Sequence, residues 1–255
     1  MIVYFAAAAC AVGVVAVASL LVRRTRRATA DADPGGPTAS HAGAMLSALF
    51  LLAFAIAVIV PWTTADAARA GTYAETQAIA ETYWAASRLP AAERDGVRSG
   101  LRAYVDTVRD PEWELMTDGR LTPAGWTLLD RVRRDVIAMK ADTDEIREAR
   151  AAVLDHVGQI AEARHQRAMD ARAAPPAGLT IVTVITGIVV VLLPFLAGAA
   201  PRGATLVPLA LMAALLAAGT YLTIDIAHPF DGALAVGPEA FVELQAELQR
   251  IDGGG

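Results

Sequence analysis

Residues 42–65 read AGAMLSALFLLAFAIAVIVPWTTA and contain no aspartate, glutamate, lysine or arginine. A helix needs about 20 consecutive apolar residues to cross the hydrocarbon core of a bilayer. Three further uncharged runs of at least 22 residues occupy 1–22, 173–201 and 203–224. We therefore expect four transmembrane helices. The pattern excludes an ordinary soluble enzyme, a disordered chain and a disulfide-stabilised scaffold.

Charge is unevenly distributed along the 255 residues. The chain is 55% hydrophobic and only 19% charged, and all of its charged residues lie outside the four apolar runs. The net charge is −5, and no basic stripe with interleaved aromatic residues is present, which excludes nucleic-acid binding. The single cysteine, Cys10, cannot form an intrachain disulfide, so cysteine usage does not indicate the redox compartment.

The first apolar run could be a secretory signal, because Ala16-Val17-Ala18 resembles a cleavage site. No lysine or arginine precedes this run, however, and four arginines follow it within the loop 23–42. Cleavage would leave a strongly basic N-terminus on the translocated side. A retained membrane anchor is the better interpretation.

Basic residues in short loops tend to stay in the cytoplasm. The arginine-rich loop 23–42 and the loop carrying Arg202 are separated by an even number of spans, so they lie on the same side. Placing that side in the cytoplasm predicts a multi-pass protein of the cell membrane. Its N-terminus, middle segment and C-terminal tail are then extracytoplasmic.

The middle segment shows no strand-like alternation and is expected to be helical. Pro90, Pro111 and Pro123 each stand where a helix can begin, and Asp110 and Thr122 precede two of them as capping residues. The first of the expected helices can continue the second span without a break. These helices cover 66–87, 91–109, 111–117, 123–140 and 143–173.

The expected fold class is thus all-α: four transmembrane helices, with a helical bundle inserted between the second and the third. In the tail, Pro229 ends the last span and Gly232 permits a turn. A short helix should follow, and its apolar face should pack onto the bundle through Phe241, Leu244, Leu248 and Ile251. In chain order the segments are transmembrane helix 1–22, basic loop 23–42, transmembrane helix 43–65, bundle 66–176, transmembrane helices 177–200 and 204–226, and tail 227–255.

No motif for catalysis, cofactor binding or metal binding occurs in the chain. The four histidines are scattered without metal-ligand spacing. Glu112 and Glu114 are two residues apart, so they cannot face the same way on a helix, and the helix dipole is sufficient to explain them. We therefore expect a protein that is not an enzyme and has no catalytic, cofactor-binding or metal-binding residues.

Charged residues near the ends of the apolar runs are the candidate functional residues. Asp225 and His228 are three residues apart, so a continuing helix would carry both on one face. They could form part of an ion path, or Asp225 could simply be a hydrated interfacial residue. Arg164 and Arg167 could pair with Asp225 or Asp231 as a structural clasp, or could present a positive mouth to anions.

Three short signatures and the order of elements indicate a family. Residues from Tyr104 to Gly119 follow the pattern Y-x8-W-E-x-M-x2-G, which includes Trp113, Glu114 and Met116. Arg164 and Arg167 then precede the third apolar run. The pattern P-F-x-G, formed by Pro229, Phe230 and Gly232, follows the fourth run. Taken together, these features resemble the bestrophin-like domain family of four-span membrane proteins, which is largely without an assigned function.

The resemblance implies a channel only by remote analogy, since true bestrophins are pentameric anion channels. Two hypotheses follow. The first is a non-enzymatic integral membrane protein that contacts the lipid bilayer, forms a homo-oligomer and conducts anions. The alternative is a membrane-anchored interaction or sensor module whose helical domain binds a partner.

Overall fold

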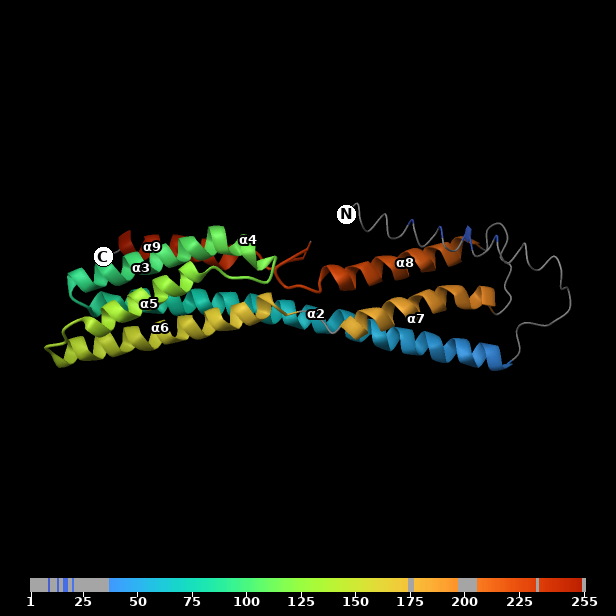
Figure 1. Cartoon of the computed structure of the whole chain (residues 1–255), viewed down its shortest axis with the longest axis horizontal. Coiled ribbons are helices and arrows are strands. Elements are labelled where there is room, and N and C mark those ends of the chain that lie inside the picture. Colours follow the sequence, from blue (N-terminus) through green and yellow to red (C-terminus); the bar gives the residue numbers. More distant parts are fainter. Residues whose placement is uncertain are drawn as a thin grey trace. The chain divides into compact units, whose positions relative to one another are not determined.

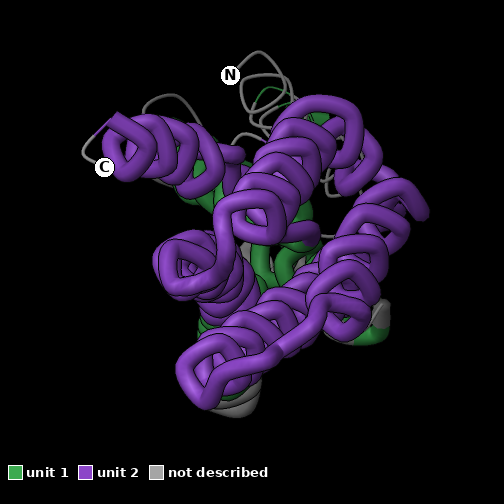
Figure 2. The backbone as a smooth tube through the Cα atoms, turned by 90° about the vertical axis from the view of Figure 1, so that its left-hand side faces the viewer, with its two compact units in different colours: residues 1–62, 174–227 green, residues 63–173, 228–255 purple. Residues whose placement is uncertain are grey.

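The computed structural model describes residues 37–173, 177–196, 206–232 and 234–253, together with the single residues 9, 13, 16, 17 and 20. All regular secondary structure in this part of the chain is helical, which confirms the all-α class. The chain divides into two compact units (Figure 2). Unit 1 comprises Met1–Trp62 and Ala174–Ala227, and unit 2 comprises Thr63–Ala173 and His228–Gly255.

The helix α2 runs from Pro37 to Ala85 without interruption (Figure 1). It contains the whole second apolar run and the first expected bundle helix, which confirms that the two are continuous. The stretch Ser47–Arg88, which includes most of α2 and the short turn after it, is the one helical segment among the described residues that is long and apolar enough to cross a membrane.

Two further apolar helices belong to unit 1: α7 (Ala177–Leu196) and α8 (Leu206–Asp225). Their most apolar stretches, Ile181–Leu192 and Leu209–Asp225, are shorter than a full span. Most of the predicted first span 1–22 and residues 23–36 of the predicted loop 23–42 lie outside the described residues. The last part of that loop, residues 37–42, is helical and begins α2, so the predicted loop is too long at this end. The four-span arrangement therefore stays a prediction.

Within unit 1, α2 packs against α7 and α8 through phenylalanine side chains that face glycines. A Cβ atom on Gly187 would lie 3.3 Å from Phe50 Cε2, and one on Gly219 would lie 2.7 Å from Phe54 Cζ. The rings of Phe50 and Phe54 stack with their centroids 5.7 Å apart. Glycine thus lets the helix backbones approach closely, as it does in many membrane helix pairs.

The helices of unit 2 surround a common interior (Figure 2). They include α3 (Ala91–Thr107), α5 (Pro123–Ala138), α6 (Asp144–Ala171) and the part of α2 from residue 63 onward. A single 3₁₀ turn, η2 (Ala86–Arg88), follows α2. The hydroxyl groups of Thr122 and Thr143 accept hydrogen bonds from Ala124 N and Ile146 N and cap α5 and α6.

The prediction that a short helix over 111–117 begins at Pro111 is wrong. Instead, α3 runs directly into a π-helical turn, η3 (Val108–Glu112), and α4 spans only Trp113–Met116. Pro111 lies inside η3 rather than at the first position of a helix. The side chain of Asp110 caps nothing and pairs with Arg109. The wide turn tolerates the missing proline N–H and adds a residue to the helical path.

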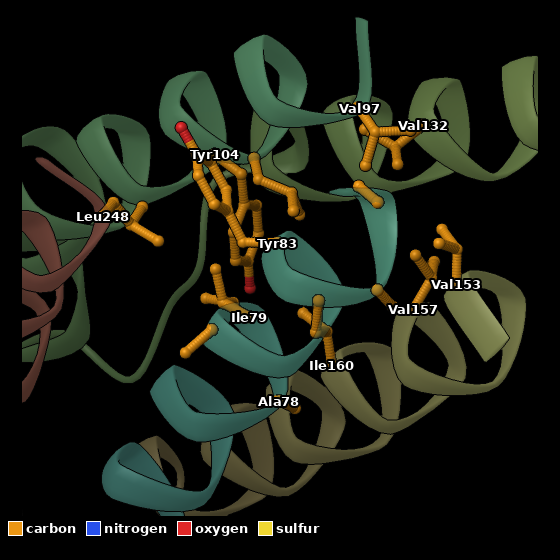
Figure 3. Packing of buried hydrophobic residues seen from close by; sticks show 14 of the residues in the cluster. Ala78, Ile79, Tyr83, Val97, Tyr104, Val132, Val153, Val157, Ile160 and Leu248 are labelled. Atoms are coloured by element: carbon orange, nitrogen blue, oxygen red, sulfur yellow. The ribbon is translucent and has the colours of Figure 1, made fainter. Parts of the chain in front are cut away.

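The tail helix α9 (Glu239–Gly253) packs as predicted. The side chains of Phe241, Leu244, Leu248 and Ile251 are at most 5% exposed and belong to the same core cluster as α2, α3, α5 and α6. Figure 3 shows Leu248 beside Tyr104 and Ile79 in this interior. Gly232 has φ +95°, the left-handed conformation expected at the turn before α9.

Candidate functional site

A cluster of charged side chains lies inside unit 2. It consists of Glu75 on α2, Tyr104 on α3, Glu112 at the end of η3, and Arg164 and Arg167 on α6, and we call it the buried cluster. None of these five residues exposes more than 1% of its surface. Charged residues are almost never buried this completely unless they are paired, so their contacts define what the cluster can do.

The local sequence explains why the two arginines face inward. Val153, Val157 and Ile160 form the core-facing stripe of α6, and Arg164 and Arg167 continue that stripe at the same spacing of three and four residues. On α2, Glu75 precedes the core residues Ile79 and Tyr83 at intervals of four. The cluster is thus an extension of the hydrophobic core in which charged side chains replace apolar ones.

Arg164 binds Glu112 through both carboxylate oxygens. Its Nη1 and Nη2 atoms donate to Oε1 and Oε2 of Glu112, each at 2.6 Å. Nη2 also donates to the carbonyl oxygen of Thr122 at 3.0 Å, and Nη1 donates to Tyr104 Oη at 3.3 Å. This two-point pairing is the strongest geometry available to an arginine and a carboxylate.

Arg167 links the two glutamates. Its Nε donates to Glu75 Oε2 at 2.7 Å, and its Nη2 donates to Glu75 Oε1 at 3.1 Å and to Glu112 Oε1 at 2.9 Å. The Tyr104 hydroxyl donates to Glu75 Oε1. The backbone N–H of Thr122 donates to Glu112 Oε2 at 3.0 Å. Two guanidinium groups and two carboxylates therefore form one continuous network whose formal charges cancel.

The network stabilises the charged form of its arginines. Burial is the largest influence on the pKa of Arg167 and lowers it, but the charges and hydrogen bonds of Glu75, Tyr104 and Glu112 together raise the pKa above its ordinary value. The pKa of Arg164 is likewise raised, because Glu112 and Tyr104 together outweigh the effect of burial. Burial, together with the charge of Glu75, raises the pKa of Tyr104 well above its usual range. The cluster therefore keeps both arginines charged and Tyr104 protonated throughout the ordinary pH range.

Aromatic rings and one glycine enclose the arginines. The guanidinium carbon of Arg164 lies 5.2 Å from the ring centre of Trp126, and that of Arg167 lies 5.9 Å from Trp113. A Cβ atom on Gly125 would lie 2.3–2.6 Å from the guanidinium group of Arg164. Gly125 is therefore required so that α5 can pass directly over this charge. Such contacts favour a cation that has lost its water.

Motif residues that are far apart in the sequence meet around this cluster. Tyr104 is a member of it, and Met116 Sδ lies 3.1 Å from Arg167 Nη1. Trp113 packs edge-on against Phe230 from the tail motif, with ring centres 5.7 Å apart. Residues 5–241 match the model of the Bestrophin-like domain family.

The chain belongs to the Bestrophin-like domain family. The match covers nearly the whole chain and confirms the resemblance carried by the motifs. Membership in the Bestrophin-like family supports a membrane or channel-like protein. No curated protein and no solved structure matches the chain significantly. The activity of this member must therefore be argued from its own site.

Arg164 and Arg167 pair with Glu112 and Glu75 rather than with Asp231, which belongs to the same unit. Asp225 belongs to unit 1, so its pairing with the two arginines stays a prediction. Because both guanidinium groups are buried and paired, neither offers a free positive charge to an anion. Asp231 is exposed, and its Oδ1 accepts a hydrogen bond from the backbone N–H of Gly232.

The prediction that Asp225 and His228 share one face of a helix is wrong. Helix α8 ends at Asp225, and His228 stands beyond it among turn residues, so the periodicity of a helix does not relate the two. The span ends before Pro229 because that proline cannot continue a helix and restricts the residue before it. Asp225 is half-buried and His228 is exposed.

Sequence reasoning missed the role of Glu112. It correctly placed Glu112 and Glu114 on different sides, since Glu112 is buried while Glu114 is exposed. It attributed both to the helix dipole, although Glu112 is the carboxylate that joins Arg164 to Arg167. The available signal was the core spacing of the two arginines, because two buried cations require buried carboxylates.

The contacts of the cluster point to a structural role, in which its charged groups join the surrounding helices. Every carboxylate oxygen in it accepts at least one hydrogen bond from a protein group. Among the described residues, no group of three histidine, cysteine, aspartate or glutamate side chains is placed to hold a metal ion. The cluster therefore holds together α2, α3, η3 and α6. Among its polar side-chain atoms, Arg164 Nε is buried without a hydrogen-bond partner.

Proposed function

We propose that this member of the Bestrophin-like family is a non-enzymatic, multi-pass protein of the cell membrane whose helical bundle, unit 2, is an interaction module. The observation that carries the proposal is the state of Arg164 and Arg167, which are buried and neutralised. An anion path lined by arginines needs exposed positive charge, whereas a rigid binding module needs a bundle whose interior is held by paired groups, as the two arginines are by Glu75 and Glu112.

The outer surface of unit 1 supports residence in lipid. Leu52 on α2, Ile188 on α7 and Leu215 on α8 expose 60%, 52% and 65% of their surface. Exposed apolar side chains on every helix of a unit are typical of contact with lipid or with another copy. We propose that the bilayer and a homo-oligomer share this surface, and the mass of the purified protein in detergent tests the oligomer.

Anion conduction by the oligomer is the second candidate, and family membership supports it. Features within unit 1 do not add to that support. Phe50 and Phe54 pack against Gly187 and Gly219. The Thr186 hydroxyl donates to the carbonyl oxygen of Val182 at 2.7 Å, as a threonine does when it satisfies itself within its own helix.

Two measurements separate the candidates. Purified full-length protein in liposomes should give no anion flux above empty liposomes. A chimera that keeps residues 63–173 and 228–255 but carries unrelated apolar helices in place of unit 1 should restore function to cells lacking the protein. Flux that increases with the amount of protein per liposome, together with a chimera that fails to restore function, would establish the channel instead.

Orientation is tested by labelling. We propose that the N-terminus, unit 2 and the tail are extracytoplasmic, on the arginine content of the loop 23–42. In a Cys10→Ser background, a Thr117→Cys variant carries its thiol at an exposed position of unit 2. An impermeant maleimide should label it in intact cells, and labelling only after lysis would place unit 2 in the cytoplasm.

A further inference from the structure

Two grooves lie on the surface of unit 2, and their polar groups are arranged differently. The first, of about 310 Å³, runs between α3 and α9. Its charged side chains satisfy one another: Arg102 Nη2 lies 3.0 Å from Asp252 Oδ2, and Gln245 Nε2 donates to Asp106 Oδ1 at 2.7 Å. This groove is the polar seam that holds α9, and these pairs occupy much of its polar lining.

The second groove, of about 260 Å³, lies between α3 and α5. Its floor is apolar and contains Val97, Val132 and Val136, each at most 3% exposed. Figure 3 shows Val97 and Val132 directed toward one another between the two helices. Glu93 and Asp135 form its charged rim.

Two glycines on α3 explain why the groove is there. At Gly100 the helices touch, since a Cβ atom would lie 2.5 Å from Val132 Cγ2. One turn earlier, at Gly96, a Cβ atom would meet nothing within 4 Å. The close contact at Gly100 draws α5 against α3, and the missing side chain at Gly96 leaves the space beside it open.

The rim carboxylates face solvent and have no protein partner in the described part of the chain. Neither Glu93 nor Asp135 has a side-chain hydrogen bond or ion pair within the described part of the chain. Arginines such as Arg131 and Arg134 occupy the same helix, yet none of them lines the groove. A free carboxylate on either side of an apolar floor favours an occupant that is apolar in the middle and cationic at its edges.

The volume indicates what kind of occupant fits. Pockets for drug-sized ligands and cofactors measure about 300–1,000 Å³, so this groove suits one or two amino-acid side chains. An amphipathic helix that inserts an apolar anchor and keeps its polar residues at the rim is a common way to fill such a groove. Arginine matches a rim carboxylate best because its planar fork binds two oxygens.

We propose that the α3–α5 groove binds a basic amphipathic helix of a partner protein, with an apolar side chain on the valine floor and arginine or lysine against Glu93 and Asp135. This inference rests on the proposed function, because it names the kind of partner that the interaction module takes. The small groove predicts weak and transient binding.

The probe is a fluorescein-labelled alanine-based peptide with one central leucine and arginines three and four residues on either side of it. Its binding to full-length protein in detergent is followed by fluorescence anisotropy. Binding should saturate, and the peptide with glutamates in place of the arginines should not bind. Replacing the central leucine by alanine should weaken binding about tenfold or more.

Two matched pairs of variants locate the binding. Gly96→Leu fills the groove without changing charge and should abolish binding, whereas Gly158→Leu, at another helical glycine with open space, should not. Glu93→Gln with Asp135→Asn should weaken binding at least tenfold. Glu81→Gln with Asp130→Asn makes the same charge change at exposed positions outside the groove and should have no effect.

Several outcomes would overturn the proposal. These are absence of saturable binding, equal binding to the Gly96→Leu protein, and equal binding of the acidic peptide. Association of the protein with itself that disappears in Gly96→Leu, without peptide binding, would assign the groove to a second copy instead. The interaction-module hypothesis fails separately, in the chimera and flux measurements, which involve no peptide.

Discussion

The two units of the chain distribute their side chains in opposite ways. Unit 1 exposes leucine and isoleucine on α2, α7 and α8 and joins its helices through glycine and phenylalanine. Unit 2 buries most of its apolar side chains in one large and one small core cluster and carries charge on its surface. This contrast is what one polypeptide needs if it is to be folded in two solvents, because lipid provides no hydrophobic force between helices whereas water does.

The same contrast explains why the buried charged residues of the cluster lie in unit 2. The buried cluster lies in unit 2, where a large core already supplies stability and can carry the desolvation of four ions. A buried ion network of this kind adds little net stability, but breaking it is costly because an unpaired charge remains. Unit 2 is therefore expected to be intolerant of single changes at its centre and tolerant at its surface.

The largest effect should come from removing α9. Burial of each of its four core side chains stabilises the fold by about 1.5–3 kcal/mol. Deletion of residues 239–255 should therefore lower the free energy of unfolding by roughly 6–12 kcal/mol, which is comparable to the stability of a whole domain. We expect unit 2 to lose its cooperative thermal transition, measured by circular dichroism in detergent, while the helices of unit 1 remain. Val242→Ala, at a residue 51% exposed on the same helix, is the control. An unchanged transition after the deletion would show that α9 does not stabilise the core.

The next largest effect is predicted for Glu112. Glu112→Ala leaves Arg164 without its carboxylate and removes one of the two acids that bind Arg167. Removing one partner of a buried pair costs about 3–5 kcal/mol. Chemical denaturation should show this loss for Glu112→Ala and no measurable loss for Glu114→Ala, since Glu114 is exposed. Equal effects of the two substitutions would mean that the network does not hold the bundle together.

Much of this contrast could be predicted from the sequence. The uncharged runs predicted the apolar helices of unit 1, and Pro90 and Pro123 predicted where α3 and α5 begin. The apolar stripe of the tail predicted the packing of α9. Helical periodicity succeeds for such elements because it depends on residues close together in the chain. The π-turn at η3 was missed, because proline before a possible helix favours a new start unless tertiary contacts hold a wider turn.

The pairing inside the cluster could not be predicted in the same way. Glu75 and Arg167 are 92 residues apart, and Glu112 and Arg164 are 52 apart, so no local pattern relates them. What the sequence did contain was the core spacing of the arginines on α6. That spacing shows that they are buried, but only the packing of α2 and η3 against α6 shows which of the many acids they bind.

A third prediction compares glycines in the two units. Gly125→Ala forces a Cβ atom into the guanidinium group of Arg164, which its bonds hold in place, and should cost about 1–3 kcal/mol. Gly219→Ala meets the end of the Phe54 ring, which is partly exposed and can shift, so unit 1 should lose less. Gly158→Ala has open space and should gain up to about 1 kcal/mol from helix propensity.

Thermal unfolding of the three alanine variants measures this order. Gly158→Ala should be the most stable of the three variants, Gly219→Ala intermediate and Gly125→Ala the least stable. If Gly125→Ala proved as mild as Gly219→Ala, the arginine would have to be mobile, and the contrast between a rigid charged centre and a yielding apolar one would be wrong.

The smallest effect concerns Asp170, a buried acid that lies near the cluster in sequence but is not part of it. Its Oδ1 accepts a hydrogen bond from Gln166 Nε2 at 2.9 Å, and its Oδ2 faces Gly71 on α2. Burial raises the pKa of Asp170 above its ordinary value, because the hydrogen bond from Gln166 compensates only in part. The folded protein therefore binds this proton more tightly than the unfolded chain does.

The sign of the pH dependence follows from that difference. Between the ordinary aspartate pKa and the raised one, stability increases as pH falls, because folding favours the protonated form. Asp170→Asn removes this term and keeps the acceptor for Gln166. The stability of wild type relative to Asp170→Asn should thus rise as pH falls from 7 toward 4, in denaturation curves measured in parallel. The exposed Asp130→Asn variant should show no such trend. A wild-type protein that loses stability relative to Asp170→Asn on acidification would mean that Asp170 is stabilised as an anion, and that unit 2 has a buried charge with a cationic partner outside the network.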